Sequence, residues 1–176
     1  YTEGSVANAF LVDRDKARFA LVQSDVAAAA VTGAGLFGAV GPLRHLRAVA
    51  SLFPEPVHVV VRRDGGIETV NGLVGRRVSL GVPGSGTRHT ALAVLRAHGL
   101  ADGSYEDVTS VDPGDALAQL ATGTLDAVIT VASAPWDQLV QAGGTAALRV
   151  LPLDATAIER VDSEVHGLVP LQIPAR

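Results

Sequence analysis

Short apolar runs alternate with segments of helical periodicity along the second half of the chain. Four runs have the length and composition of buried strands, at 78–82, 108–111, 125–131 and 148–153. Three segments between them have helical spacing, at 87–98, 115–121 and 136–142. Strands and helices that alternate through short turns are typical of an α/β sheet with parallel crossovers. The pattern therefore predicts an α/β fold.

The first part of the chain follows a less regular pattern. It predicts a helix at 8–18, a strand at 19–23, a helix at 26–31 and strands at 46–52 and 57–62. The last two strands are separated by Pro54-Glu55-Pro56, where we expect a bend because proline cannot donate to a strand ladder. A break in the apolar pattern at about residues 60–72 indicates a linker.

Composition and charge narrow the classes of partner. The 176 residues suffice for one domain or two small lobes, and 48% of them are hydrophobic. The net charge is −4 and there is no basic run, which argues against a nucleic-acid partner. Cysteine is absent, which excludes disulfides, thiolate metal sites and cysteine nucleophiles. The absence does not decide the redox compartment.

One stretch reaches the length of a membrane span. Residues 26–43 contain no charge, but glycines and Pro42 fill their second half, so we expect a short helix followed by a loop instead. The opening residues, Tyr1 to Gly4, lack the basic and apolar regions of a signal peptide. We therefore expect either that a signal peptide was removed or that the chain starts within a longer protein.

A glycine-rich turn between a predicted strand and a predicted helix is the most informative segment. It contains Gly84, Ser85, Gly86 and Thr87, and the two hydroxyls can cap the helix. Unpaired N–H groups at such a helix start bind carboxylate or phosphate. The spacing does not match a P-loop, a dinucleotide fingerprint or a nucleophile elbow. The alternative is a plain turn whose glycines only permit tight packing.

Two other junctions between strand and helix carry polar or aromatic side chains. Gln23, Ser24 and Asp25 follow the strand predicted at 19–23, and ligands bind at such strand ends in open α/β sheets. Asp25 is a candidate partner for an amino group, with helix capping as its alternative role. Ser133 and Trp136 lie at the third junction, where the tryptophan either walls a pocket or fills the core.

The histidines give little sign of catalysis or metal binding. None of the five has the i, i+4 spacing of a metal pair, and we expect neither a metal nor a cofactor. Glu55 and His58 form a weaker candidate for proton transfer, with an ordinary hydrogen bond as the alternative. A hydrolase or transferase that uses Ser85 with His89 or His58 is the least favoured hypothesis, because the motif spacings fail.

Six segments resemble the TAXI branch of the TRAP-transporter substrate-binding proteins. They lie at residues 2–8, 20–27, 46–58, 77–87, 125–127 and 149–154. The resemblance implies a type II periplasmic-binding fold with two α/β lobes and a ligand cleft between them. Family members are longer at both ends, so we expect the chain to be truncated and its first lobe incomplete. On this template residues 1–62 form the partial first lobe, 63–160 the second lobe and 161–176 a returning hinge strand.

The same resemblance implies a non-enzymatic, extracytoplasmic solute-binding protein. It would capture a small organic anion, either glutamate- or glutamine-like or a dicarboxylate, and deliver it to TRAP-type permease subunits. Its place would be periplasmic or otherwise extracytoplasmic, with lipid anchoring of the full-length protein left open. Family members often have aromatic residues where this chain has Ala28, Ala29 and Ala30, which leaves the ligand open. The alternative function is a ligand-sensing domain of the same fold attached to a signalling partner.

Overall fold

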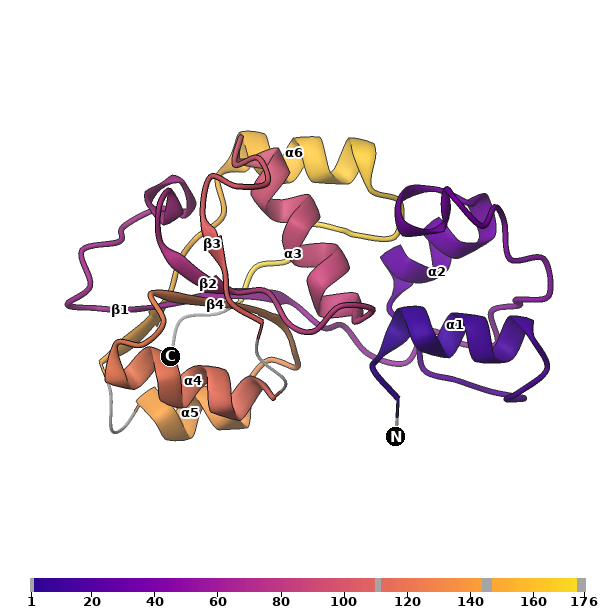
Figure 1. Ribbon diagram of the computed structural model, residues 1–176, viewed down its shortest axis with the longest axis horizontal. Helices are drawn as coiled ribbons and strands as arrows, with labels where there is room; N and C mark the ends of the chain where they lie inside the picture. Colours follow the sequence, from indigo (N-terminus) through magenta and orange to yellow (C-terminus); the bar gives the residue numbers. More distant parts are fainter. Residues whose placement is uncertain (1, 110–111, 144–146, 174–176) are drawn as a thin grey trace.

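A five-stranded mixed sheet forms the centre of the second half of the chain (Figure 1). The computed structural model describes residues 2–109, 112–143 and 147–173. In chain order the strands are β1 (Val57–Arg62), β2 (Arg77–Ser79), β3 (Glu106–Asp107), β4 (Ala127–Val131) and β5 (Leu148–Val150). Their order across the sheet is β3-β2-β4-β1-β5. β2 runs parallel to β3 and β4, whereas β1 is antiparallel to β4 and β5.

This strand order confirms the predicted fold class. Among otherwise parallel strands, one antiparallel strand lies beside the edge strand β5. The antiparallel strand is β1, which reaches the sheet directly from the first part of the chain and pairs with β4 from Val57↔Val131 to Val61↔Ala127. Residues 57–62, which the sequence analysis assigned to the first lobe, therefore lie inside the sheet.

Helices cover both faces of the sheet, and each face has its own core. α3 (Gly86–Ala97) and α6 (Ala155–Glu164) lie on one face (Figure 1). The core beneath α3 includes Val59, Leu80 and Leu95. α4 (Pro113–Thr122) and α5 (Asp137–Gly143) cover the other face, where Leu120 packs. The short 3₁₀ helix η2 (Val70–Leu73) adds two buried residues to the first core. The central strands β1, β2 and β4 are thus mostly buried, as their largely apolar composition requires, whereas the edge strand β3 is exposed.

The beginning of the chain forms a separate helical part beside the sheet. It consists of α1 (Ser5–Asp13), α2 (Ser24–Thr32) and the 3₁₀ helix η1 (Gly35–Phe37), which pack around a core of their own (Figure 1). α2 ends at Gly33, whose φ of 72° is a left-handed conformation that favours glycine. The uncharged stretch at 26–43 is therefore a short helix and a loop, as predicted. No helix of the described residues is long and apolar enough to cross a membrane.

The strands predicted at 19–23 and 46–52 are not formed, and the described residues of the returning hinge strand expected within 161–176 form the end of α6 and, after a turn, a segment without strand pairing. Within the described residues these segments have no strand partner, and a strand exists only where a neighbour accepts and donates its backbone hydrogen bonds. The prediction was wrong there because an apolar run does not supply that neighbour. Phe19 and Val49 are 78% and 80% exposed as a result. The strand predicted at 108–111 is not formed at residues 108–109, since β3 ends at Asp107, and residues 110–111 lie outside the described residues, as does Pro174.

An ion pair joins the start of β2 to the turn that precedes β4. Arg77 donates to both carboxylate oxygens of Asp126, at 3.0 Å each, and the Arg77 backbone N–H donates to the same carboxylate at 2.9 Å. The Arg77 guanidinium lowers the pKa of Asp126. Because the pKa is lower in the folded state, the pair stabilises the fold above the pKa of an ordinary aspartate, about 4. This contribution is lost as the pH falls through the lowered pKa of Asp126.

We expect Asp126→Asn to lower the free energy of unfolding by about 1–2 kcal/mol at pH 7, because a charged hydrogen-bond partner is removed. Urea unfolding at pH 7 and in steps below about pH 4 checks this, since wild type and variant should converge in acid. The matched control is Asp64→Asn, whose carboxylate pairs with Arg62 but is 82% exposed. An effect of Asp64→Asn as large as that of Asp126→Asn would contradict the assignment.

Candidate functional site

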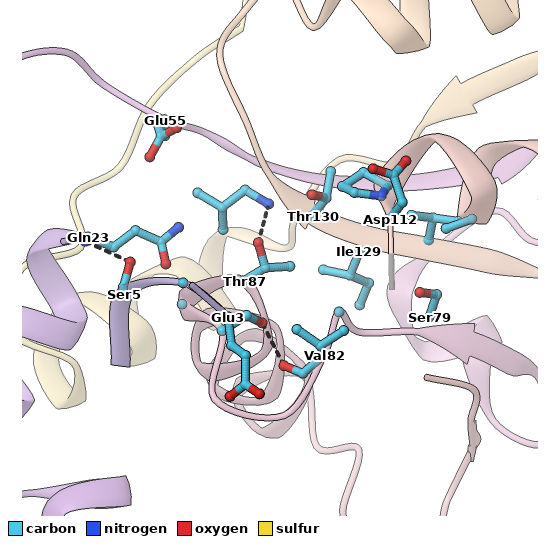
Figure 2. Close-up of a pocket in the computed structure, with 18 residues that line it drawn as sticks. Glu3, Ser5, Gln23, Glu55, Ser79, Val82, Thr87, Asp112, Ile129 and Thr130 are labelled. Carbon is cyan, nitrogen blue, oxygen red and sulfur yellow. Dashed lines mark hydrogen bonds between the residues drawn. The ribbon is translucent and has the colours of Figure 1, made fainter. Parts of the chain in front are cut away.

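A cavity of about 300 Å³ opens at the carboxyl ends of β2 and β4 (Figure 2). Its walls are the starts of α3 and α4, the ends of the two strands, and residues from the helical part. Ligands of open α/β sheets bind at such strand ends, and the volume lies at the lower limit of small-molecule sites. The lining includes five residues predicted from the sequence, namely Gln23, Glu55, Ser85, Gly86 and Thr87.

The turn that leads into α3 is held by its own backbone and by one serine. Gly81 and Gly84 both adopt φ of 82°, which only glycine takes without strain. The Ser85 hydroxyl donates to the Val82 carbonyl at 2.8 Å and accepts from the Arg88 N–H at 3.1 Å. The Ser85 N–H donates to the same Val82 carbonyl. Ser85 is thus the N-cap of α3, as its side chain predicted.

Two backbone N–H groups at the start of α3 remain available. Among the described residues, no acceptor is found for the N–H groups of Gly86 and Thr87, and both residues line the cavity. The Thr87 hydroxyl is engaged only weakly, by the Val131 N–H at 3.5 Å. Free N–H groups and the positive end of the helix dipole together attract an anion. The start of α3 therefore has the chemistry of a carboxylate-binding site.

The helical part brings a side chain against this helix start. A Cβ placed on Gly86 would lie 1.6 Å from Oε1 of Gln23, so the carboxamide lies directly against the glycine. The Gln23 N–H donates to the Ser5 hydroxyl at 3.1 Å, which fixes the backbone of Gln23 (Figure 2). Oε1 itself is buried and has no hydrogen-bond partner among the described residues. A buried acceptor without a partner is costly, and a ligand N–H or O–H would satisfy it.

Two buried hydroxyls on the strands line the same cavity. Ser79 at the end of β2 is 2% exposed and Thr130 on β4 is 3% exposed. In the described part of the chain no hydrogen bond to either hydroxyl is found, but the buried side-chain atoms without a partner there are Gln23 Oε1 and Arg149 Nε, not these oxygens. The sequence analysis missed both residues. The available signal was a single polar residue within each of two otherwise apolar strands.

The start of α4 differs from the start of α3 because it already holds a carboxylate. Oδ1 of Asp112, the N-cap residue, accepts from the N–H groups of Gly114 at 2.6 Å and Asp115 at 3.4 Å. Glu3, Glu55 and Asp112 lie on different sides of the cavity (Figure 2). No lysine, arginine or histidine is among the described residues that line it. The cavity is therefore acidic apart from the start of α3.

Ser24 and Asp25 lie outside the cavity lining and connect the helical part to the rest of the chain. The Ser24 hydroxyl donates to the Gly167 carbonyl at 2.6 Å. Asp25 is 1% exposed and accepts a hydrogen bond from the Thr90 hydroxyl on α3 at 2.5 Å. Both contacts link segments far apart in the sequence. In the structure these side chains position Gln23 against α3 by holding α2 in place.

The other predicted site residues also lie outside the cavity lining. Trp136 is 8% exposed and belongs to the core beneath α4, where its indole N–H donates to Gln138 Oε1 at 3.2 Å. The Ser133 hydroxyl donates to the Pro135 carbonyl. Gly84 shapes the turn before Ser85 and does not border the cavity. Of the alternatives open for Trp136, the structure shows core packing.

The histidines lie apart from the cavity. Ring nitrogen Nδ1 of His58 is 3.0 Å from the Pro56 carbonyl, and its ring packs against Trp136 with 5.8 Å between centroids. Burial lowers the pKa of His58, which favours the neutral ring. In the described residues no histidine ring forms a hydrogen bond with the Ser85 hydroxyl, whose proton is directed at the Val82 carbonyl. No group of metal-ligating side chains occurs in the same residues.

Solved structures with partial similarity are periplasmic binding proteins. The aliphatic sulphonate-binding protein SsuA from Escherichia coli is 27% identical, with a TM-score of 0.46, over 56% of this chain and 33% of that chain. The alkanesulfonate-binding SsuA from Xanthomonas axonopodis pv. citri, bound to MOPS, is 23% identical, with a TM-score of 0.45, over 56% and 34%. A periplasmic binding protein from Brucella ovis with glutathione bound is 19% identical, with a TM-score of 0.44, over 57% and 30%.

The aligned regions cover part of each molecule, and the chain matches about a third of the length of these solved structures. The match to a family model, in contrast, covers all residues that line the cavity and every element around it. It extends over residues 1–176, from the residues before α1 through the sheet to the segment after α6. The chain therefore belongs to the NMT1-like family.

Proposed function

We propose that the protein is an extracytoplasmic solute-binding protein that holds a small carboxylate-bearing molecule in the cavity between the helical part and the sheet. One observation carries this proposal. The start of α3, where the N–H groups of Gly86 and Thr87 are free, lies against Gln23 Oε1, which has no hydrogen-bond partner among the described residues. Each side of this contact comes from a different part of the molecule. A ligand placed there would complete the hydrogen bonds of both parts at once.

The carboxylate of the ligand would lie at the start of α3, where Gly86, Thr87 and the cap residue Ser85 present the positive end of the helix. Gln23 and Ser5 would contact its polar groups from the opposite side. Delivery to a TRAP-type membrane permease, as in the TAXI branch that the sequence resembles, is part of the proposal. A helix start that offers free N–H donors, with the Ser85 hydroxyl proton directed at the Val82 carbonyl, supports a binding role over a catalytic one.

Thermal unfolding with and without small amino acids and dicarboxylates tests the proposal. A ligand at 100 times its Kd adds about 2.7 kcal/mol to the stability of the native state. We expect at least one such compound to raise the Tm by about 5–10 °C, given a shift of about 2–4 °C per kcal/mol for a chain of this size. Failure of every compound to raise the Tm would contradict the proposal.

The variant Ser85→Ala removes the cap of α3 and should reduce this ligand-induced shift. Its Tm without ligand should also fall, because the loss of a serine N-cap costs about 1 kcal/mol. Ser163→Ala is the matched control, since that hydroxyl caps a carbonyl of α6 far from the cavity. The control should keep the full shift, and an equal loss in both variants would count against the site.

A further inference from the structure

The start of α2 is held between two segments that lie far from it in the sequence. On one side is the loop after α6, where a Cβ added to Gly167 would lie 2.6 Å from the carbonyl carbon and oxygen of Ser24. On the other side is α3, where the Thr90 hydroxyl donates to Oδ2 of Asp25 at 2.5 Å. Two adjacent residues of the helical part, Ser24 and Asp25, thus contact two different segments.

The contact with α3 follows one face of that helix. Gly86 and Thr90 are four positions apart, so they lie on the same face and are separated by about one turn. Gln23 lies against Gly86, and Asp25 accepts the hydrogen bond from Thr90. A separation of α2 from α3 at Thr90 would therefore also withdraw Gln23 from the cavity.

Asp25 is a buried acidic residue without a cationic partner. Asp25 and Thr90 are each 1% exposed, and no lysine, arginine or histidine of the described residues forms an ion pair with Asp25. Its carboxylate accepts from the Val26 N–H at 2.8 Å and from the Thr90 hydroxyl. Because Val26 belongs to α2 itself, Thr90 supplies the one hydrogen bond that Asp25 receives from another segment within the described residues.

The burial of Asp25 makes this contact sensitive to a single hydroxyl group. A buried carboxylate is costly unless hydrogen bonds replace those that water would supply. Without the Thr90 hydroxyl, Asp25 would lose one of its two hydrogen bonds while it stayed buried. Movement of α2 away from α3 would return the carboxylate to water and leave both parts folded, since each part has a core of its own.

We propose that Thr90 is a positioning residue that holds the helical part against α3 by satisfying the buried Asp25 carboxylate, and that loss of its hydroxyl separates the two parts and widens the cavity. This role concerns the arrangement of the chain without ligand and applies to any solute that enters the cavity. A failure of every solute to bind would contradict the proposed function and leave the role of Thr90 untouched.

Spin-label distances between the two parts test the role of Thr90 without a ligand. The chain has no cysteine, so Val31→Cys on α2 and Val140→Cys on α5 create two unique labelling positions at exposed side chains. We expect one narrow distance population in the labelled chain and in its Thr90→Ser variant, which keeps a hydroxyl. In Thr90→Val, which has a similar size and no hydroxyl, the ratio of this population to longer distances should fall at least about tenfold, which corresponds to about 1.4 kcal/mol.

Addition of Asp25→Asn to Thr90→Val distinguishes the effect of charge from that of packing. Asparagine keeps an acceptor for the Val26 N–H and carries no charge, so the double variant should regain most of the narrow population. Thr122→Val is the matched control. The Thr122 hydroxyl donates to the Ala118 carbonyl of its own helix, as that of Thr90 donates to the Gly86 carbonyl, but it lies on α4.

The outcomes are distinct. Unchanged distances in Thr90→Val would overturn the role of Thr90, as would a separation that Asp25→Asn does not reverse or that Thr122→Val reproduces. Asp25→Asn alone gives a test that does not require Thr90→Val to fold, and circular dichroism checks the fold of each variant. Its distances should match those of the wild type, because a neutral amide costs less to bury than a carboxylate. Separation of the two parts in this variant would overturn the role as well.

Discussion

Replacing Gly86 with alanine is expected to weaken the binding of L-glutamine at least about tenfold, a loss of about 1.4 kcal/mol or more. The new methyl group would lie 1.6 Å from Gln23 Oε1 and 2.8 Å from the Ser5 hydroxyl. Both are side-chain atoms, so the fold can accommodate the methyl group by moving them. The carboxamide would then move into the space assigned to the carboxylate, beside the Gly86 and Thr87 N–H groups.

Calorimetric titration of Gly86→Ala and thermal unfolding without ligand separate binding from folding. We expect the Tm to change little, because alanine is favoured over glycine within a helix by about 1 kcal/mol and this offsets part of the steric cost. Gly65→Ala is the control, since a Cβ there meets its nearest atom at 3.4 Å in a turn outside the cavity. An unchanged affinity in Gly86→Ala would mean that the ligand does not bind at the start of α3.

The variant Leu95→Ala should lower the free energy of unfolding by about 2–5 kcal/mol, the range for a leucine truncated in a packed core. Leu95 is fully buried between α3 and the sheet and packs in the same core as Leu80 and Ile129. Its removal leaves a cavity beneath the helix that presents the proposed carboxylate site. Since native domains are stable by only about 5–15 kcal/mol, this loss is a large fraction of the total.

Urea unfolding of Leu95→Ala and Leu92→Ala provides the measurement. Leu92 lies on the same helix and is only partly buried, so its truncation removes less contact and leaves a smaller cavity. We therefore expect the larger effect at Leu95. A larger effect at Leu92 would mean that α3 packs on the sheet by a different face, and the position of Gly86 in the cavity would have to be revised.

Most elements of the sheet could be predicted because they depend on local pattern, whereas β3 (Glu106–Asp107) lies before the strand predicted at 108–111. The helix of α3 was predicted from its periodicity and from the Ser85 cap, and β4 from an apolar run bounded by polar residues. The extended segments at 19–23 and 46–52 were predicted as strands by the same rule and are not strands. Their runs are equally apolar, but pairing depends on a neighbour that the local sequence does not contain.

The site was predictable where it depends on a turn and unpredictable where it depends on register. Gly86 and Thr87 could be predicted as site residues from the glycine-rich turn. Gln23 could be predicted because it stands at the end of an apolar run. Ser79 and Thr130 line one cavity only because β2 pairs with β4 in the register Ser79↔Val128. That pairing joins residues about fifty positions apart, and no local pattern specifies it.

Besides the hydrogen bond from Thr90 on α3 to Asp25 on α2, two stretches of chain connect the helical part with the rest of the molecule. The chain passes from η1 through residues 44–56 into β1, and after α6 it comes back to α2, where Gly167 accepts a hydrogen bond from Ser24 (Figure 1). A body tethered once can rotate about several axes, whereas two separated tethers leave mainly rotation about the line between them. Motion of the helical part should therefore widen or narrow the ligand entrance along one direction, with little twisting or sliding.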